Sequence, residues 1–187
     1  DLITQLIAAE EDGERLSTDA LIGTCILLLN AGHEATVHAL GNGVACALAN
    51  ETPLAAFQPD TIAATTEEIL RYDPPLHVFE RFAYEDIDLN GIILEKGKKI
   101  ALVLGAAGRD PAVYPDPDRF DPTRPVKPHA AFGGGLHFCV GAPLARLEMQ
   151  IGLRALFEHA PQLRLAEVPR YANTYHFHKL ERLMVEI

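Results

Sequence analysis

The chain has 187 residues, a formal net charge of −10 and three cysteines. This length allows one domain with a substantial core, which buries roughly 70% of the unfolded surface. The acidic charge and the lack of a basic arm argue against nucleic acid as a partner. The cysteines form no C-x-x-C pair, which argues against a zinc ribbon and favours a reducing, cytoplasmic setting.

Two helices are predicted in the first 50 residues. Apolar residues recur at helical spacing from Leu2 to Ile7. A second helix is expected from Ser17 or Thr18, both good N-caps, to about Asn50, a length of roughly 45 Å. It is apolar nearly all round between Leu21 and Leu29, so protein is expected on every side of it. That apolar run is too short to span a bilayer, and no membrane partner is predicted.

A third helix is predicted from about residue 60 to Tyr72. It ends before Pro74 and Pro75, because proline cannot continue a helix and restricts the residue before it. Glu68 and Arg71 are three residues apart and share one face of this helix. Alone, such a pair is a weak signal, since most contribute only ~0.3 kcal/mol on a solvated face.

The next elements are a small sheet, an irregular loop, a helix and a hairpin. Residues 87–104 alternate apolar and polar around Asn90-Gly91, which predicts a small antiparallel β-sheet. Residues 108–128 are rich in Pro and Asp and predict a loop. A long helix is predicted after Cys139, ending near His159, and residues 163–187 alternate like another hairpin. Periodicity alone indicates a mixed, helix-rich chain.

The most informative stretch is the glycine-rich segment before this last helix. Gly133, Gly134 and Gly135 permit backbone angles that other residues avoid and let a large flat ligand approach closely. Cys139 follows them, and the helical pattern begins within two residues of it. A sulfur near the unpaired N–H groups of a helix start is favoured as thiolate, the form that binds iron. The alternative is an ordinary buried cysteine behind a glycine-rich loop.

This segment has a fixed spacing, Phe132-x-x-Gly135-x-His137-x-Cys139-x-Gly141. The spacing resembles the haem-binding loop of the cytochrome P450 haem-thiolate monooxygenases. The resemblance implies that Cys139 is the axial iron ligand of a non-covalent haem b, with Phe132 packed beside the sulfur and His137 at a propionate. The cofactor-binding residues that it implies in this loop and the helix start are Cys139, His137, Phe132, Gly133, Gly141 and Ala145.

A second segment also resembles this family, in the long helix predicted from Ser17 or Thr18 to about Asn50. Its sequence, Ala31-Gly32-His33-Glu34-Ala35-Thr36, is similar to the distal-side signature. Ala31 and Gly32 would leave space beside the haem, and Glu34 would relay protons through water. Where the family usually has threonine this chain has Ala35, and Thr36 is rotated from that position by about 100°. We expect a substrate hydroxyl or an ordered water to supply the missing group. Glu34, Ala35 and Thr36 are the predicted catalytic set; a buried, paired acid is the alternative for Glu34.

The resemblance gives Glu68 and Arg71 a structural role, holding the haem loop in place with a third arginine. Arg119 is the first candidate for this arginine and Arg124 the second. Arg81 would bind a haem propionate through its planar guanidinium; the alternative is a strand residue on the surface.

Family members line the substrate pocket with the segment after the two prolines and with the C-terminal turn. The predicted substrate-binding residues are therefore Leu76, His77, Val78, Phe79 and Phe177. His176 and His178 also suggest a metal pair, which competes with an exposed strand face as their explanation.

The resemblance implies a mainly α fold with small β-sheets. It covers residues 1–187, which correspond to the C-terminal, haem-binding portion of a cytochrome P450-like domain. The N-terminal distal part of the family is expected to be absent. The implied function is a soluble, bacterial-type monooxygenase that activates O2 to hydroxylate a small apolar organic substrate.

Electrons would come from a ferredoxin or flavodoxin-like partner, and from NAD(P)H only through that partner. Lys127 and Arg146 are candidates for docking such an acidic protein. The alternative function is a truncated, non-catalytic fragment that binds haem or self-associates through its exposed long helix.

Overall fold

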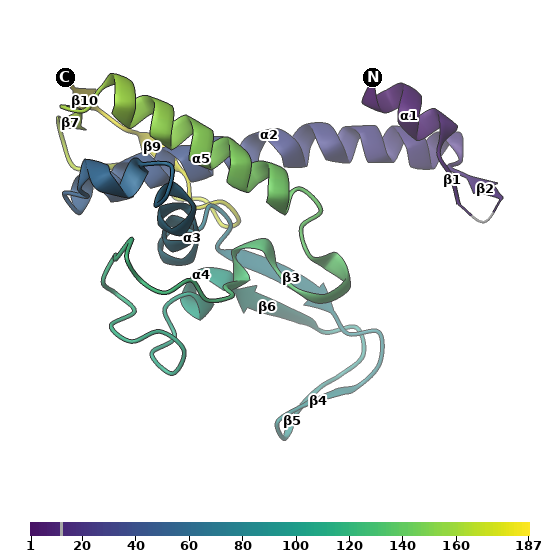
Figure 1. Cartoon of the computed structure of the whole chain (residues 1–187). Helices are drawn as coiled ribbons and strands as arrows, with labels where there is room; N and C mark the ends of the chain where they lie inside the picture. The colour runs from purple at the N-terminus through teal and green to yellow at the C-terminus, as the bar shows by residue number, and fades with distance from the viewer. Residues whose placement is uncertain (12) are drawn as a thin grey trace. The chain divides into compact units, whose positions relative to one another are not determined.

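The computed structural model of the chain describes residues 1–11 and 13–187, in two units, 1–35 and 36–187. The first unit contains α1 (Leu2–Ala8), the short strands β1 (Glu10–Glu11) and β2 (Glu14–Arg15), and the beginning of α2 (Thr18–Ala49) (Figure 1). At the start of α2, the Ser17 hydroxyl accepts a hydrogen bond from the Ala20 N–H at 3.2 Å. This bond satisfies one of the N–H groups that every helix start leaves unpaired, as the predicted N-cap requires.

The second unit holds the rest of α2 and further helices. They are the 3-10 turns η1 (Leu54–Phe57), η2 (Ala130–Phe132) and η3 (Gly135–His137), and the helices α3 (Ile62–Tyr72), α4 (Leu104–Ala107) and α5 (Ala142–His159). α3 ends just before Pro74 and Pro75, as expected. α5 carries Pro143 in its first turn, where the missing N–H has no helical partner to lose.

The strands described in the second unit pair antiparallel in twos. β3 (Val78–Phe82) pairs with β6 (Lys99–Val103). Between them in sequence, β4 (Ile87–Leu89) and β5 (Ile92–Leu94) form a hairpin that Figure 1 shows extending from this pair. Asn90 and Gly91 connect them with φ of 54° and 88°, as a two-residue type I′ turn requires.

Two strand pairings differ from the predictions. The predicted sheet over residues 87–104 is divided, because β6 pairs with β3 and not with the β4–β5 hairpin. The single hairpin predicted over residues 163–187 is instead two pairs, β7 (Arg164–Leu165) with β10 (Val185–Glu186), and β8 (Arg170–Tyr171) with β9 (Leu180–Arg182). Alternation specifies which face of a strand is buried but not which strand is its partner.

The core of the second unit is built from α2, α3, η1 and α5. Ile69 of α3 and Met149 of α5 are fully buried, and Phe57 of η1 stacks on Phe157 of α5 with ring centroids 4.0 Å apart. Gly43 of α2 permits close packing, since a Cβ there would lie 3.4 Å from the Ile69 side chain. The prediction of a mainly helical fold with small β-sheets is confirmed.

By length and composition alone, α2 qualifies as a membrane-crossing helix. It has 32 residues, and an 18-residue window within it has a mean hydropathy of 1.3 with no buried residue. The run from Leu21 to Leu29 is shorter than a bilayer, and the 18-residue window that meets the criteria is longer than this run. Core helices of soluble proteins and signal sequences meet the same criteria.

Candidate functional site

Cys139 lies between η3 and α5 and is held by backbone hydrogen bonds on both sides. Its N–H donates to the Phe132 carbonyl at 3.0 Å, and its own carbonyl accepts from the N–H of Ala142, the first residue of α5, at 3.2 Å. Gly133 and Gly135 have φ of 71° and 66°, where an L side chain would be strained. The glycines therefore shape the turn that delivers the sulfur to the helix start.

The surface around the Cys139 sulfur is open and apolar. Cys139 is exposed, and the neighbouring Leu136 and Val140 are 96% and 89% exposed. Covering apolar side chains of this size is favourable, so this surface suits a flat, largely apolar ligand. A cysteine sulfur is also one of the ligands that proteins use for haem iron. The residues present at this loop thus fit a haem.

Three further cofactor candidates belong to the same segment. His137 is exposed at the end of η3, and the N–H of Ala145 donates to the Gly141 carbonyl at 2.9 Å in the first turn of α5. A Cβ at Gly141 would lie 3.8 Å from the Cys139 sulfur, an ordinary contact. The sulfur alone therefore does not require glycine at this position.

Arg81 lies on β3. Its side chain is exposed, donates to the Glu80 carbonyl at 2.9 Å and lies 5.6 Å from the centre of the Phe79 ring. The contacts described for its guanidinium are thus local ones, and its role at a propionate stays a prediction.

The distal-side candidates Ala31, Gly32, Glu34 and Ala35 belong to the first unit, whereas Thr36 and Cys139 belong to the second. Residues 31–36 are helical throughout, and Ala35 and Thr36 are half-buried. Their catalytic and cofactor roles remain predictions.

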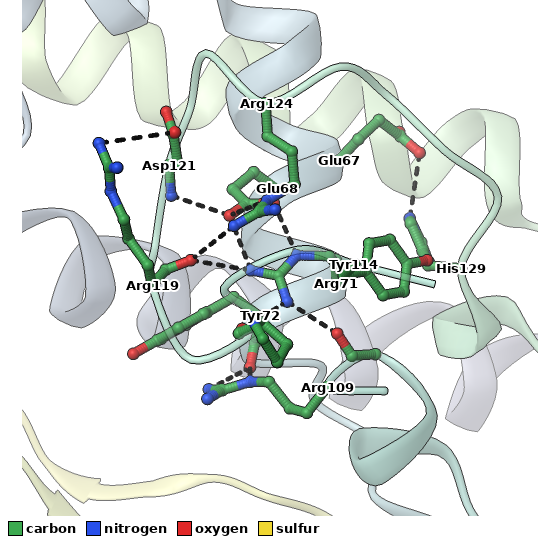
Figure 2. Close-up of polar contacts among 12 residues, drawn as sticks. Glu67, Glu68, Arg71, Tyr72, Arg109, Tyr114, Arg119, Asp121, Arg124 and His129 are labelled. Atoms are coloured by element: carbon green, nitrogen blue, oxygen red, sulfur yellow. Dashed lines mark hydrogen bonds and ion pairs between the residues drawn. The ribbon is translucent and has the colours of Figure 1, made fainter. Parts of the chain in front are cut away.

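Glu68 and Arg71 form a buried ion pair on α3, the centre of the network in Figure 2. Arg71 donates to both carboxylate oxygens of Glu68 at 2.7 Å. Its remaining N–H groups donate to the carbonyls of Gly108, Pro117 and Arg119 at 2.7, 2.9 and 3.2 Å. All five guanidinium N–H groups therefore have an acceptor, as a buried charge requires.

The third arginine of this network is Arg124, the second candidate, and not Arg119. Arg124 Nε lies 3.4 Å from Glu68 Oε1, which also accepts from the Asp121 N–H at 2.8 Å. The Arg119 side chain is 71% exposed and lies 3.7 Å from Asp121, so Arg119 contributes only its backbone carbonyl to Arg71. Which arginine reaches Glu68 depends on how the loop folds between Arg119 and Arg124, which spacing along the sequence does not reveal.

Glu67 forms a second network that the sequence did not predict. Its carboxylate accepts from Arg146 Nε and Nη2 at 2.6 and 3.0 Å and lies 3.1 Å from His129 Nε2. Burial alone would raise the pKa of Glu67, but the hydrogen bonds from His129 and Arg146 lower it to about 2. The one sequence feature that points to this network is that Glu67 is an acidic residue immediately before the Glu68–Arg71 pair.

The basic residues predicted to dock a partner are engaged within the chain. Arg146 pairs with Glu67, and its guanidinium lies 4.6 Å from the centre of the Phe132 ring. Lys127 Nζ donates to the Val113 carbonyl at 2.8 Å. Docking through these two charges therefore stays a prediction.

The predicted substrate-binding residues lie in two segments that the structure brings together. Leu76 forms an isolated antiparallel bridge with Phe177 of the C-terminal turn. Val78 and Phe79 begin β3, and the Phe79 ring packs edge-on against His176 with centroids 5.1 Å apart. Residues nearly 100 positions apart in sequence thus form one surface.

The ring of His77, between Leu76 and Val78 in the chain, is part of an aromatic stack, and its role at a substrate stays a prediction. Its ring stacks on His178 at 4.0 Å with planes 11° apart, and His178 stacks in turn on Tyr171 at 4.1 Å. Burial and the neighbouring His178 lower the pKa of His77. Asp73 accepts from the Tyr171 hydroxyl at 2.7 Å and lies 3.0 Å from His178 Nε2.

Asp73, His77 and His178 also place ligand atoms within 4.8 Å of one another. The nitrogen lone pairs of a histidine lie in the plane of its ring, and the two stacked rings lie in nearly parallel planes, so the lone pairs of His77 and His178 do not converge on one point. The geometry is that of a stack closed by a hydrogen-bonded acid, and His176 packs against Phe79 instead of pairing with His178.

The sequence of the chain is similar to those of known proteins. A family model described as cytochrome P450 matches residues 61–160. The biotin biosynthesis cytochrome P450 of Bacillus subtilis (strain 168) is 42% identical over 99% of this chain and 47% of its own length. The PikC monooxygenase of Streptomyces venezuelae is 43% identical over 90% of this chain and 42% of its own length.

Solved structures give the same result. The crystal structure of P450BioI with an acyl carrier protein that carries hexadec-9Z-enoic acid has a TM-score of 0.89 and 40% identity, and covers 100% of this chain and 51% of that one. The cytochrome P450 PksS of Bacillus subtilis 168 has a TM-score of 0.94 and 37% identity, with 99% and 49% covered. The chain thus spans about half the length of the relatives that it matches.

Proposed function

The chain belongs to the cytochrome P450 family, and we propose that residues 1–187 are the C-terminal, haem-binding portion of a monooxygenase. The observation that carries the proposal is Cys139, the exposed cysteine at the start of α5, within exposed apolar side chains that suit a flat ligand. The coverage of about half of each relative supports the assignment to a portion of a longer catalytic unit.

In this proposal a haem b bound at the loop supplies the iron chemistry that activates O2. The Cys139 sulfur would bind the iron, and the Phe132 ring would pack beside the sulfur. Glu68, Arg71 and Arg124 hold the preceding segment in place. Glu34 would pass protons through water, and Ala31 and Gly32 would leave space beside the haem. The group missing at Ala35 would come from a substrate hydroxyl or an ordered water.

The reaction that we propose is hydroxylation of an organic substrate. Relatives of this chain include a 6-deoxyerythronolide B hydroxylase and a vitamin D(3) 25-hydroxylase, 42% and 43% identical. Leu76, His77, Val78, Phe79 and Phe177 would contact the substrate. The bridge between Leu76 and Phe177 and the packing of Phe79 against His176 support this assignment. A ferredoxin or flavodoxin-like protein in the cytoplasm would supply electrons.

The test is the absorption spectrum of the purified chain with added haemin, reduced and exposed to carbon monoxide. We expect the red-shifted band of thiolate ligation for the natural sequence and its loss in Cys139→Ser. Cys25→Ser is the matched control, because Cys25 is a half-buried cysteine of the first unit and should leave the band unchanged. An unaltered spectrum in Cys139→Ser would overturn the proposal.

One observation favours a second candidate function, a haem-binding or self-associating piece without turnover. Leu144, Leu147 and Ile151 form a face of α5 on which each side chain is more than half exposed, and exposed apolar faces favour association. The mass of the chain in solution, measured with and without haemin, distinguishes a self-associating piece from a haem-binding monomer.

A further inference from the structure

The segment that carries Cys139 is bounded by two residues that contact the same carboxylate. His129 precedes the loop and Arg146 follows it on α5, and both contact Glu67 of α3. The Arg146 guanidinium donates to both oxygens, at 2.6 and 3.0 Å, in the bidentate arrangement that makes such pairs strong. One side chain of α3 therefore holds both flanks of the loop.

The His129 contact needs only one tautomer of the ring. The Ala131 N–H donates to His129 Nδ1 at 3.3 Å, so Nδ1 carries the lone pair. Nε2 then carries the proton and donates to Glu67 Oε2 at 3.1 Å. The His129 side chain is almost fully buried, so these two hydrogen bonds fix the orientation of its ring. They thereby also fix the position of His129 itself, the residue that immediately precedes η2.

The Arg146 contact reaches Cys139 through Phe132. The guanidinium that pairs with Glu67 also lies over the Phe132 ring, 4.6 Å from its centre. The Phe132 carbonyl in turn accepts the hydrogen bond from the Cys139 N–H at 3.0 Å. The Arg146 side chain, which is about seven-tenths buried, thus connects the Glu67 carboxylate through Phe132 to the backbone of Cys139.

This network is separate from that of the neighbouring Glu68. Consecutive residues of a helix are rotated by about 100°, and in Figure 2 Glu67 points toward His129 while Glu68 points toward Arg71 and Arg124. Glu68 holds the irregular segment that precedes the loop. Glu67 holds the loop itself, whose exposed apolar side chains contribute little burial of their own.

We propose that Glu67 is a positioning residue that clamps the Cys139 loop at both ends, through His129 on one side and Arg146 on the other. The clamp sets the place of the sulfur in the chain without haem. Its consequence for an iron ligand rests on the proposed function.

The first test measures hydrogen exchange of the Cys139 N–H in the full chain without haem, relative to the Leu153 N–H in the core. Glu67→Gln keeps the shape of the side chain but removes the charge and turns an NH2 group toward Arg146 and His129. We expect the ratio of the Cys139 rate to the Leu153 rate to rise by about tenfold. The charge-assisted hydrogen bonds of Glu67 hold the loop closed, so their loss makes local opening of the loop easier. Glu158→Gln, which removes the exposed pair with Arg154 on α5, is the matched control and should leave the ratio unchanged. An unchanged ratio in Glu67→Gln would overturn the clamp.

The second test asks whether Glu67 and Arg146 act as one unit. Arg146→Lys keeps the positive charge but loses the two-pronged bond and the planar contact with Phe132. We expect it to raise the exchange ratio alone and to add little in a chain that already carries Glu67→Gln. Fully additive effects of the two substitutions on the ratio contradict a single clamp.

The third readout is spectroscopic and separates the clamp from the proposed function. With haemin bound, Glu67→Gln should lower the share of the thiolate band in the reduced carbon monoxide complex, and Glu158→Gln should not. A share unchanged in Glu67→Gln would count against the clamp. If the natural sequence itself shows no thiolate band, the proposed function fails while the exchange ratio still decides the clamp.

Discussion

Glu67 and Glu68 are chemically identical neighbours with different tasks. Glu68 is buried with Arg71 and Arg124, and Glu67 is partly buried with His129 and Arg146. The difference arises because one step along a helix turns the side chain toward another part of the chain. Both carboxylates hold segments on the N-terminal side of Cys139, and Glu67 alone also contacts the helix that follows it.

The lowered pKa of Glu67 makes its contribution to stability dependent on pH. The folded-state pKa of about 2 lies below the ordinary value of 4.5, so the ionised carboxylate stabilises the folded state above about pH 4.5, and this contribution is lost as the pH falls toward 2. We expect Glu67→Gln to lower the free energy of unfolding by ~1–3 kcal/mol at pH 7, allowing for solvent screening. In urea unfolding, the difference from the natural sequence should shrink between pH 4.5 and pH 2.

Glu158→Gln again serves as the control, since its pair with Arg154 is exposed on both sides and such pairs contribute less than ~1 kcal/mol. A Glu67→Gln difference that is the same at pH 7 and pH 3 would show that the carboxylate charge is not what stabilises the fold.

At the scale of elements, α3 and α4 approach each other so closely that one position allows only glycine. A Cβ at Gly108, which follows α4, would overlap the backbone carbonyl of Arg71 in α3. The Gly108 carbonyl also accepts from Arg71 Nη1 at 2.7 Å. Its φ of −68° is open to any residue, so the constraint is the approach of the two elements and not the backbone angle.

Two glycine-to-alanine substitutions should therefore have opposite effects. Gly108→Ala must displace backbone, and we expect it to lower the free energy of unfolding by ~1–3 kcal/mol or more. Gly23→Ala lies in α2 with nothing within 4 Å of its new Cβ, and it should favour the helix by up to ~1 kcal/mol. Urea unfolding followed by far-ultraviolet circular dichroism measures both. A Gly108→Ala chain as stable as the natural one would disprove the close approach.

At the scale of the whole molecule, burial is confined to the second unit among the residues whose side chains are described. No residue in 1–9 or 13–35 is buried, whereas Ala39, Ala45 and Ala47 of the same helix α2 are. Local stability follows burial, because exposed backbone hydrogen bonds open without loss of packing.

We therefore expect two classes of hydrogen exchange along α2. Amides from Thr18 to Ala35 should exchange faster than those from Ala39 to Ala47, as measured by mass spectrometry of overlapping peptides. Uniform protection along the helix would mean that the first unit is covered in solution, by a second copy or by another chain.

What the sequence by itself determined was local. The 3.6-residue period located α2, α3 and α5, the spacing of glycines and cysteine showed the resemblance to a haem-binding loop, and three-residue spacing paired Glu68 with Arg71. Each of these signals depends on residues close in the chain, whose relative positions follow from the geometry of one helix or one turn.

Tertiary structure alone decided the rest. It chose Arg124 over Arg119, joined Glu67 to His129 and Arg146, and paired β6 with β3. These contacts join residues that are far apart in sequence, where several partners of the same charge or pattern are available. The choice among them depends on how the irregular segment turns and how the helices pack, because a charge or an apolar face carries no record of the distant residue that it will meet.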